Sequence, residues 1–188
     1  MEVLIVLAHP ERRSFSGGLV DVATETLNLA GHEVEIDDLY GEGFDPVERS
    51  SWYGKRQDEC YFAPLTEQRA HYDANALPQD VQREIARLNW ADLVIFQFPL
   101  WWHSQPAILK GWFDRVLVYG GLYSGSMRYD RGYFRGKQAM CSVTTGSPAQ
   151  AFMPFGRAGN WVEWLWPVHS QLYYCILYTL TLRPVHHG

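Results

Sequence analysis

Three ring-bearing side chains stand next to one another at Trp101, Trp102 and His103. Pro99 precedes them and ends an apolar run, because proline cannot donate to a ladder of backbone hydrogen bonds. Pro106 follows them at a position that suits the start of a helix. The three residues therefore belong to a loop between a strand and a helix, and neither element needs them for folding. Large rings on such a loop can stack on a flat ligand and form one wall of its site.

Two other loops carry groups that could hold the same ligand. The first runs from His9 to Ser16 and offers the hydroxyls of Ser14 and Ser16 beside the backbone N–H groups of a helix start, which suit a phosphate. The second, 145–148, contains hydroxyls and Gly146, whose backbone can approach a ring system closely. A ligand with a phosphate at one end and a flat heterocycle at the other fits all three loops.

These loops need a sheet that brings them to one edge. Strands are expected at 3–8, 34–39, 92–98, 137–144 and 174–182. Helical spacing lies between them at 19–30, 78–90, 106–118 and 162–167, with a short helix around 65–72 inside an irregular excursion over 40–77. The alternation indicates a doubly wound α/β sheet, in which ligands bind beyond the carboxyl ends of the strands. The length of 188 residues is most simply one domain, 1–188.

Composition argues against several classes of protein. The net charge of −5, with no basic stripe, makes nucleic acid an unexpected partner. The start lacks the features of a signal peptide, and Pro167 and polar residues interrupt the apolar stretch 161–182, so no membrane insertion is expected. The three cysteines show no pairing pattern, which fits a reducing cytoplasm. His186 and His187 are expected to be solvated, so no metal site is predicted.

Neither glycine-rich nucleotide fingerprint, G-x-G-x-x-G or G-x-x-x-x-G-K-[ST], occurs in the sequence. Instead, a hydroxyl-rich loop after the first strand resembles that of flavodoxin. More specific segments are LIVLAH at 4–9, ER at 11–12 with SF at 14–15, DLY at 38–40, ADLVIFQFPL at 91–100, PAILKGWF at 106–113, YD at 129–130 and TTG at 144–146. In these segments and their order the chain is similar to the NAD(P)H:quinone reductase (DT-diaphorase-like) family.

The resemblance implies a fold, a cofactor and a reaction. The fold is a flavodoxin-like three-layer sandwich with a five-stranded parallel sheet. The enzyme is a homodimer with FAD at the subunit interface, and FMN is the alternative because some short relatives use it. In the expected ping-pong reaction, NAD(P)H reduces the flavin by hydride transfer and leaves, and a quinone-like acceptor then takes two electrons at the same face.

The resemblance also assigns roles to residues. By resemblance, the residues that line the pyrophosphate and its neighbourhood are His9, Phe15 and Ser16. Ser14 is added to the cofactor-binding residues because its hydroxyl lies at the helix start. The isoalloxazine is bordered by Pro99, Leu100, Trp101, Trp102 and His103, and its far edge is held by Thr144, Thr145, Gly146 and Ser147. The stretch that reaches the substrate in the family matches Leu122, Tyr123 and Ser124. The candidates for catalytic roles are His103 and Tyr123, and loop amides around Trp102 and His103 are expected to donate to the flavin edge.

Two positions depart from the family pattern. The family has a tyrosine shortly after Thr-Thr-Gly and a histidine six residues further on, which help to stabilise charge and move protons. Phe152 and Ala158 stand there in this sequence, and neither can donate a proton. Protons are then expected from water or from His103. The sequence also ends soon after the fifth strand, which makes it either a compact variant or a chain with a truncated terminus.

Three alternatives follow from these departures. The chain could be a flavin-binding electron carrier that serves a protein partner, or a regulatory protein that keeps the fold without quinone reductase activity. It could also have lost flavin altogether. For the ring residues themselves, Trp101 and Trp102 could be core or dimer contacts, and His103 could be a plain surface histidine.

Overall fold

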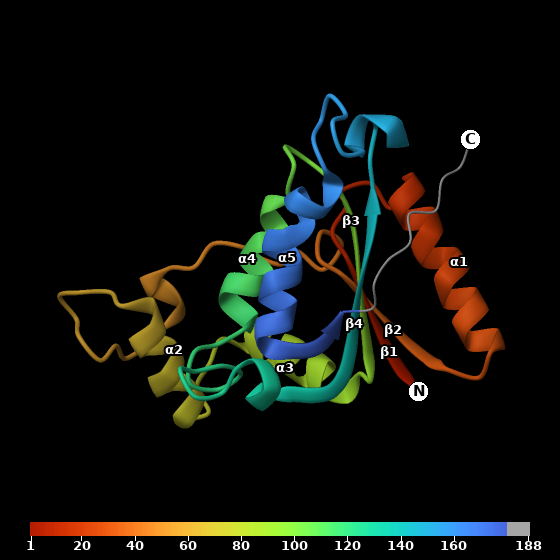
Figure 1. Ribbon diagram of the computed structural model, residues 1–188. Coiled ribbons are helices and arrows are strands. Elements are labelled where there is room, and N and C mark those ends of the chain that lie inside the picture. The colour runs from red at the N-terminus through yellow and green to blue at the C-terminus, as the bar shows by residue number, and fades with distance from the viewer. Residues whose placement is uncertain (180–188) are drawn as a thin grey trace.

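A parallel sheet stands at the centre of the computed structural model, which describes residues 1–179 (Figure 1). Its strands are β1 (Glu2–Leu7), β2 (Glu33–Asp38), β3 (Leu93–Pro99), β4 (Phe134–Thr144) and β5 (Ile176–Thr179). They lie in the order β2-β1-β3-β4-β5, and every neighbouring pair is parallel. β5 is a short edge strand beside β4. The doubly wound α/β architecture predicted from the sequence is confirmed, with its topological switch point between β1 and β3.

Helices cover both faces of this sheet (Figure 1). The helices are α1 (Phe15–Leu29), α2 (Pro64–Asp73), α3 (Gln79–Trp90), α4 (Ala107–Val116) and α5 (Trp161–Cys175), with 3₁₀ turns at Ser50–Trp52, Tyr129–Arg131 and Ala149–Phe152. α1 lies on one face, and α3, α4 and α5 lie on the other. Successive side chains of a strand point to opposite faces. Thus Leu4 and Val6 of β1 join the large core under α3 to α5, while Val3 and Ile5 join the smaller core under α1.

α5 runs further than the sequence indicated, because Pro167 does not end it. Residues 174–175, expected to open the fifth strand, complete this helix instead. The reason is a buried stripe of helical spacing, formed by Leu165, Val168, Leu172 and Cys175. Pro167 itself is exposed, so its ring meets solvent. The last part of the expected strand, 180–182, and the two histidines 186–187 lie outside the described residues.

The excursion after β2 folds back onto α4. Arg115 of α4 is only 2% exposed and anchors it: its Nη1 donates to the Asp45 carbonyl at 2.6 Å and to Asp80 Oδ2 at 2.6 Å. Its guanidinium also lies 4.5 Å from the centroid of the Trp52 ring. A side chain at Gly111 would meet the Pro46 carbonyl at 2.1 Å, so the glycine permits this close approach.

Across residues 1–179, no helix combines the length and apolarity that crossing a membrane requires.

Candidate functional site

A two-residue turn at the carboxyl end of β3 carries the exposed rings. Trp101 N–H donates to the Ser104 carbonyl and Ser104 N–H to that of Trp101, both at 3.0 Å. Between them Trp102 and His103 have φ of 49° and 61°, the left-handed values of a type I′ turn. Such values cost non-glycine residues on the order of 1 kcal/mol each. Strain of this kind persists where the surrounding structure holds it, and it often marks functional sites.

The turn presents a ring and two donors. The Trp102 side chain is 97% exposed, whereas Trp101 is 42% exposed. Within residues 1–179, the backbone N–H groups of Trp102 and His103 have no hydrogen-bond acceptor. An exposed indole beside unused amide donors suits a flat heterocycle with polar atoms along one edge.

The loop after β1 forms a tight start for α1. Ser14 caps the helix, since its Oγ accepts from Gly17 N–H at 3.2 Å. The next amides, of Phe15 and Ser16, are the ones that a helix start leaves without intrahelical acceptors, and they suit a phosphate. A Cβ at Gly17 would come within 1.9 Å of the Arg12 carbonyl, so this loop needs glycine there. The Phe15 ring is 65% exposed.

Hydrogen bonds and ring contacts join this loop to its neighbours. Ser16 is buried, and its Oγ lies 3.0 Å from Thr144 Oγ1 at the end of β4. The His9 ring lies 6.0 Å from the Trp101 ring. His9 Nδ1 lies 3.0 Å from both the backbone N–H and the carbonyl oxygen of Glu11, so the loop fixes the orientation of the ring. The first loop therefore contacts Trp101 of the turn and Thr144, the last residue of β4, after which the third loop begins.

The loop after β4 completes the edge. Pro99 pairs with Thr144 in the β3–β4 register, and Leu100 N–H donates to the Thr144 carbonyl at 2.8 Å. Beyond it, the residues 145–147 are exposed, and Thr145 Oγ1 donates to the Ser147 carbonyl at 2.9 Å. The ends of β1, β3 and β4 lie together at one edge of the sheet (Figure 1), so the fold gathers the three predicted loops.

Two residues at this edge were missed by sequence reasoning. The Nε2 of Gln97, a donor on β3, is buried and has no acceptor within residues 1–179. Trp164 of α5 stacks on His103, with ring centroids 4.1 Å apart and ring planes 32° apart. Spacing along the chain could not reveal either residue. In the sequence, Gln97 is simply one residue of a strand, and the contact of Trp164 with His103 depends on how α5 lies over the edge.

The predicted substrate residues lie elsewhere in the chain. Leu122 is fully buried in the core, and Ser124 Oγ accepts from Met127 N–H within its own turn. Tyr123 is half-buried and follows α4, whose ten residues span about 15 Å. The turn at 101–104 precedes that helix. A single chain therefore does not bring Tyr123 to the turn.

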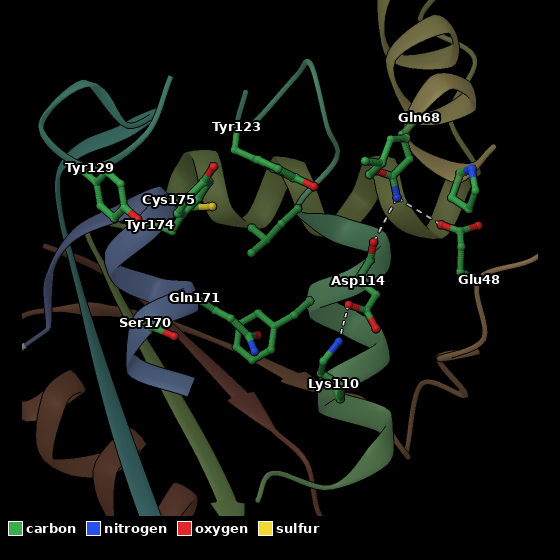
Figure 2. Close-up of a pocket in the computed structure, with 14 residues that line it drawn as sticks. Glu48, Gln68, Lys110, Asp114, Tyr123, Tyr129, Ser170, Gln171, Tyr174 and Cys175 are labelled. Carbon is green, nitrogen blue, oxygen red and sulfur yellow. Dashed lines mark hydrogen bonds and ion pairs between the residues drawn. The ribbon is translucent and has the colours of Figure 1, made fainter. Parts of the chain in front are cut away.

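Tyr123 instead lines a cavity of about 650 Å³ between α2, α4 and α5. Figure 2 shows Tyr129 and Tyr174 on one side of it, and Lys110 and Asp114, which form an ion pair, on the other. Burial raises the pKa of Tyr123 above its ordinary value, so its hydroxyl keeps its proton at neutral pH. The tyrosine can act there as a neutral hydrogen-bonding group.

The edge fits a flavin by the chemistry of its groups. The open start of α1 suits the phosphate end, and the exposed Trp102 ring suits the heterocycle. The two free amides of the turn suit the polar edge of that ring, and the orphaned Gln97 amide is the kind of buried donor that a ligand or water satisfies. Phe152, at the end of a 3₁₀ turn, and Ala158, in the loop that follows, offer no side-chain donor, as the sequence indicated.

Comparison with known proteins agrees with this fold and site. A model of the family described as flavodoxin-like fold matches residues 1–185. The ribosyldihydronicotinamide dehydrogenase [quinone] of Mus musculus is 42% identical over 176 residues, which cover 93% of this chain and 76% of that protein. NAD(P)H dehydrogenase [quinone] 1 of Rattus norvegicus is 42% identical over 168 residues, which cover 89% of this chain and 61% of the relative.

A solved structure is also similar along most of the chain. A Klebsiella pneumoniae protein described as a quinone reductase superposes with a TM-score of 0.89 at 37% identity, covering 96% of this chain and 73% of that one. The chain therefore belongs to the flavodoxin-like family, in the branch that holds the NAD(P)H:quinone reductases, and the family predicted from the sequence is confirmed.

Proposed function

We propose that the protein is a flavin-dependent NAD(P)H oxidoreductase that reduces quinone-like acceptors by two-electron hydride transfer. One observation carries the proposal: an exposed indole and two unused amides lie at the carboxyl end of β3, beside the open start of α1. A flavin is a ligand with matching ends. The names of the similar proteins, which are quinone dehydrogenases, support the same function.

The proposed site assigns each loop a part of the cofactor, with FAD as the flavin we infer. The amides of Phe15 and Ser16 hold phosphate, and the His9 ring lines the neighbourhood of the pyrophosphate. Trp102 covers the ring, and the amides of the turn donate to its polar edge. Residues 144–147 hold the far edge. When bound, the flavin supplies the hydride chemistry, while the protein orients it and excludes competing reactions.

In the proposed ping-pong order, nicotinamide donor and acceptor use one face in turn. The chain's part is to keep that face shaped by Trp102 and to leave it free between the two half-reactions. With Phe152 and Ala158 unable to donate, His103 and water are the sources of protons at this edge. A His103→Ala variant with both half-reactions unchanged would assign the protons to water alone.

We infer that the functional unit is a homodimer, because Tyr123 and the turn of the same chain lie at opposite ends of α4. A second copy can bring its Tyr123 to the turn, where the neutral phenol would donate a hydrogen bond to the acceptor.

We also propose that the protein works in a reducing compartment, the cytoplasm, because its thiols Cys60, Cys141 and Cys175 are free.

Anaerobic stopped-flow spectroscopy tests the proposal. The purified protein is loaded with FAD or FMN and mixed with NADH, NADPH or ribosyldihydronicotinamide, and then with a benzoquinone. The expected result is loss of flavin absorbance on donor addition and its full return on quinone addition. A protein that takes up neither flavin would overturn the proposal. A flavin that accepts electrons from a chemical reductant but no hydride would mark an electron carrier instead.

A matched pair of variants adds specificity. Trp102→Ala removes the ring wall, whereas Trp102→Phe keeps an aromatic face. We expect weaker flavin binding in the first and near-normal binding in the second. Equal binding by both variants would show that the indole does not contact the cofactor.

A further inference from the structure

The His103 ring has a partner that the proposed reaction does not explain. It stacks on the Trp164 ring with centroids 4.1 Å apart, and the two residues come from the turn after β3 and from α5. The contact therefore joins the turn that forms the proposed flavin wall to the first turn of α5. Within residues 1–179, no other ring contact joins a central residue of the turn, Trp102 or His103, to another element.

Trp164 is itself held in place. Its Nε1–H donates to the Ala158 carbonyl at 2.5 Å. Gly159 has φ of 82°, and a Cβ at that position would meet Trp164 Nε1 at 3.1 Å. The backbone of 158–159 thus forms a seat for the indole, and Gly159 leaves the room that this seat needs.

The turn has a reason to need such support. Both of its central residues are in the left-handed region without being glycine, so the isolated segment would favour other conformations. The Trp102 side chain is almost fully exposed and contributes little packing. Of the two central side chains, the His103 ring is therefore the one through which the rest of the protein can hold the turn.

We propose that Trp164 is a positioning residue, which clamps the turn through the His103 ring and so fixes the Trp102 indole and the amides of Trp102 and His103 for the flavin. The ligand in this inference rests on the proposed function, but the clamp is a property of the protein before any ligand binds. The proposal gives His103 a stacking role that does not depend on its ability to carry a proton.

A double-mutant cycle tests the clamp. His103→Ala, Trp164→Ala and the double variant are compared with His103→Phe and Trp164→Phe, which keep an aromatic contact. Affinity for FAD and FMN is measured by fluorescence titration. Each alanine variant should bind the flavin about 3- to 10-fold more weakly, and the double variant no more weakly than either single one. Both phenylalanine variants should bind within about twofold of the original protein.

A second measurement needs no flavin. In the apoprotein, the ring current of Trp164 should move the proton resonances of the His103 ring upfield, an effect lost in Trp164→Ala and kept in Trp164→Phe. Trp166→Ala is the matched control, since this neighbour on α5 is 62% exposed and should leave both measurements unchanged. Circular dichroism verifies that every variant is folded.

The outcomes separate the clamp from other roles of these residues. Weak binding by His103→Phe equal to that of His103→Ala would overturn the clamp and point to the imidazole's polar chemistry. Additive losses in the double variant, or His103 resonances unaffected by Trp164→Ala, would overturn it as well. If the original protein binds no flavin, the proposed function fails, and the apoprotein spectra alone decide the clamp.

Discussion

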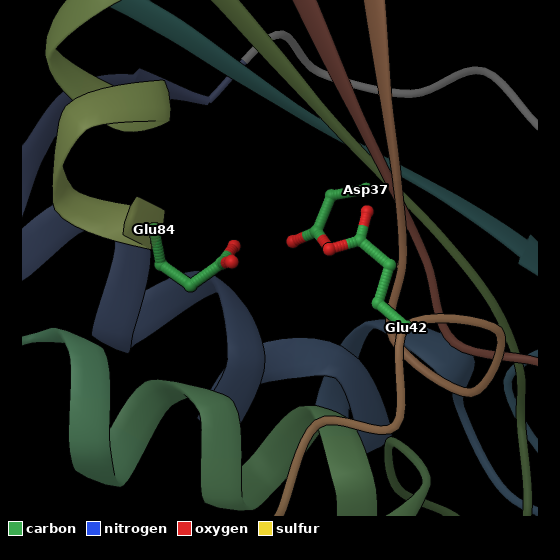
Figure 3. A group of neighbouring side chains, drawn as sticks. All are labelled: Asp37, Glu42 and Glu84. Carbon is green, nitrogen blue, oxygen red and sulfur yellow. The ribbon is translucent and has the colours of Figure 1, made fainter. Parts of the chain in front are cut away.

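Asp37 of β2 and Glu84 of α3 are carboxyl groups that face each other inside the protein, with Glu42 beside them (Figure 3). Oxygens of the three side chains lie within 4.8 Å of one another, and Asp37 and Glu84 are fully buried. Arg87 Nη1 donates to Asp37 at 3.1 Å and to Glu84 at 3.0 Å. Because Arg87 and Arg83 already pair with these carboxylates, the group is an ion-pair network rather than a cation site.

The buried pair shares a proton. Burial, followed by the hydrogen bond to Glu84 and the charge of Glu84, raises the pKa of Asp37 to about 9, although the charge of Arg87 opposes this shift. Burial also raises the pKa of Glu84, but hydrogen bonds from Asp37 and Trp112 and the charge of Arg87 outweigh this and leave it below its usual value. At neutral pH, Asp37 therefore holds the proton and Glu84 is ionised.

The first prediction concerns stability at alkaline pH. Unfolded Asp37 loses its proton near pH 4, so from there to about pH 9 the folded state binds the extra proton and stability falls as pH rises, by at most about 1.4 kcal/mol per pH unit. Asp37→Asn imitates the protonated group, since its NH₂ can donate to Glu84. Urea unfolding should find this variant more stable than the original protein near pH 8.5, with the difference shrinking towards pH 5.

The exposed Asp73 of α2 supplies the control for that experiment. Asp73→Asn removes one carboxylate from the surface and should leave the pH dependence unchanged. Parallel pH profiles for Asp37→Asn and the original protein would contradict the shared proton.

The second prediction concerns the loop after β1. Gly17→Ala places a methyl group 1.9 Å from the Arg12 carbonyl, so the loop must move. We expect a loss of about 1–3 kcal/mol in the free energy of unfolding and a clear loss of flavin affinity. Gly18→Ala meets nothing within 4 Å and should be neutral or gain up to about 1 kcal/mol from helix propensity. Similar flavin affinity in Gly17→Ala and Gly18→Ala would show that this loop does not hold the cofactor.

The third prediction concerns the anchor of the excursion at 40–77. Arg115→Lys loses the two-pronged pairing with Asp80 and the stacking on Trp52, and lysine cannot reproduce either. Thermal and urea unfolding should show a loss on the order of 2 kcal/mol. The exposed Arg135 is the control, and Arg135→Lys should stay within about 0.5 kcal/mol of the original protein.

The sheet was predictable because its central strands are continuous apolar runs. Residues 93–98 are buried on both faces, so they show no alternation and leave little doubt about a parallel strand. α5 was harder. The stripe of Leu165, Val168, Leu172 and Cys175 has helical spacing, but Pro167 interrupts the local signal, and only burial of that stripe against the sheet decides in favour of the helix.

The site was predictable to the extent that it follows from strand ends. The loops at 9–16, 99–105 and 145–148 meet because parallel strands end at one edge. The Trp164 contact was not predictable, because it depends on how α5 crosses that edge. The sequence also did not indicate that Tyr123 lies far from the turn, because this distance follows from the position of α4 between them.

The last prediction tests whether Tyr123 serves the site of a second copy. Trp102→Ala and Tyr123→Ala homodimers should both be poor quinone reductases. In a heterodimer of the two variants, one site lacks both residues and the other has both, because each site takes Trp102 from one copy and Tyr123 from its partner. Differently tagged chains, coexpressed and purified as the heterodimer, should recover about half of the original activity per dimer. If Tyr123 instead acted in its own chain, each site would lack one residue and no activity would return.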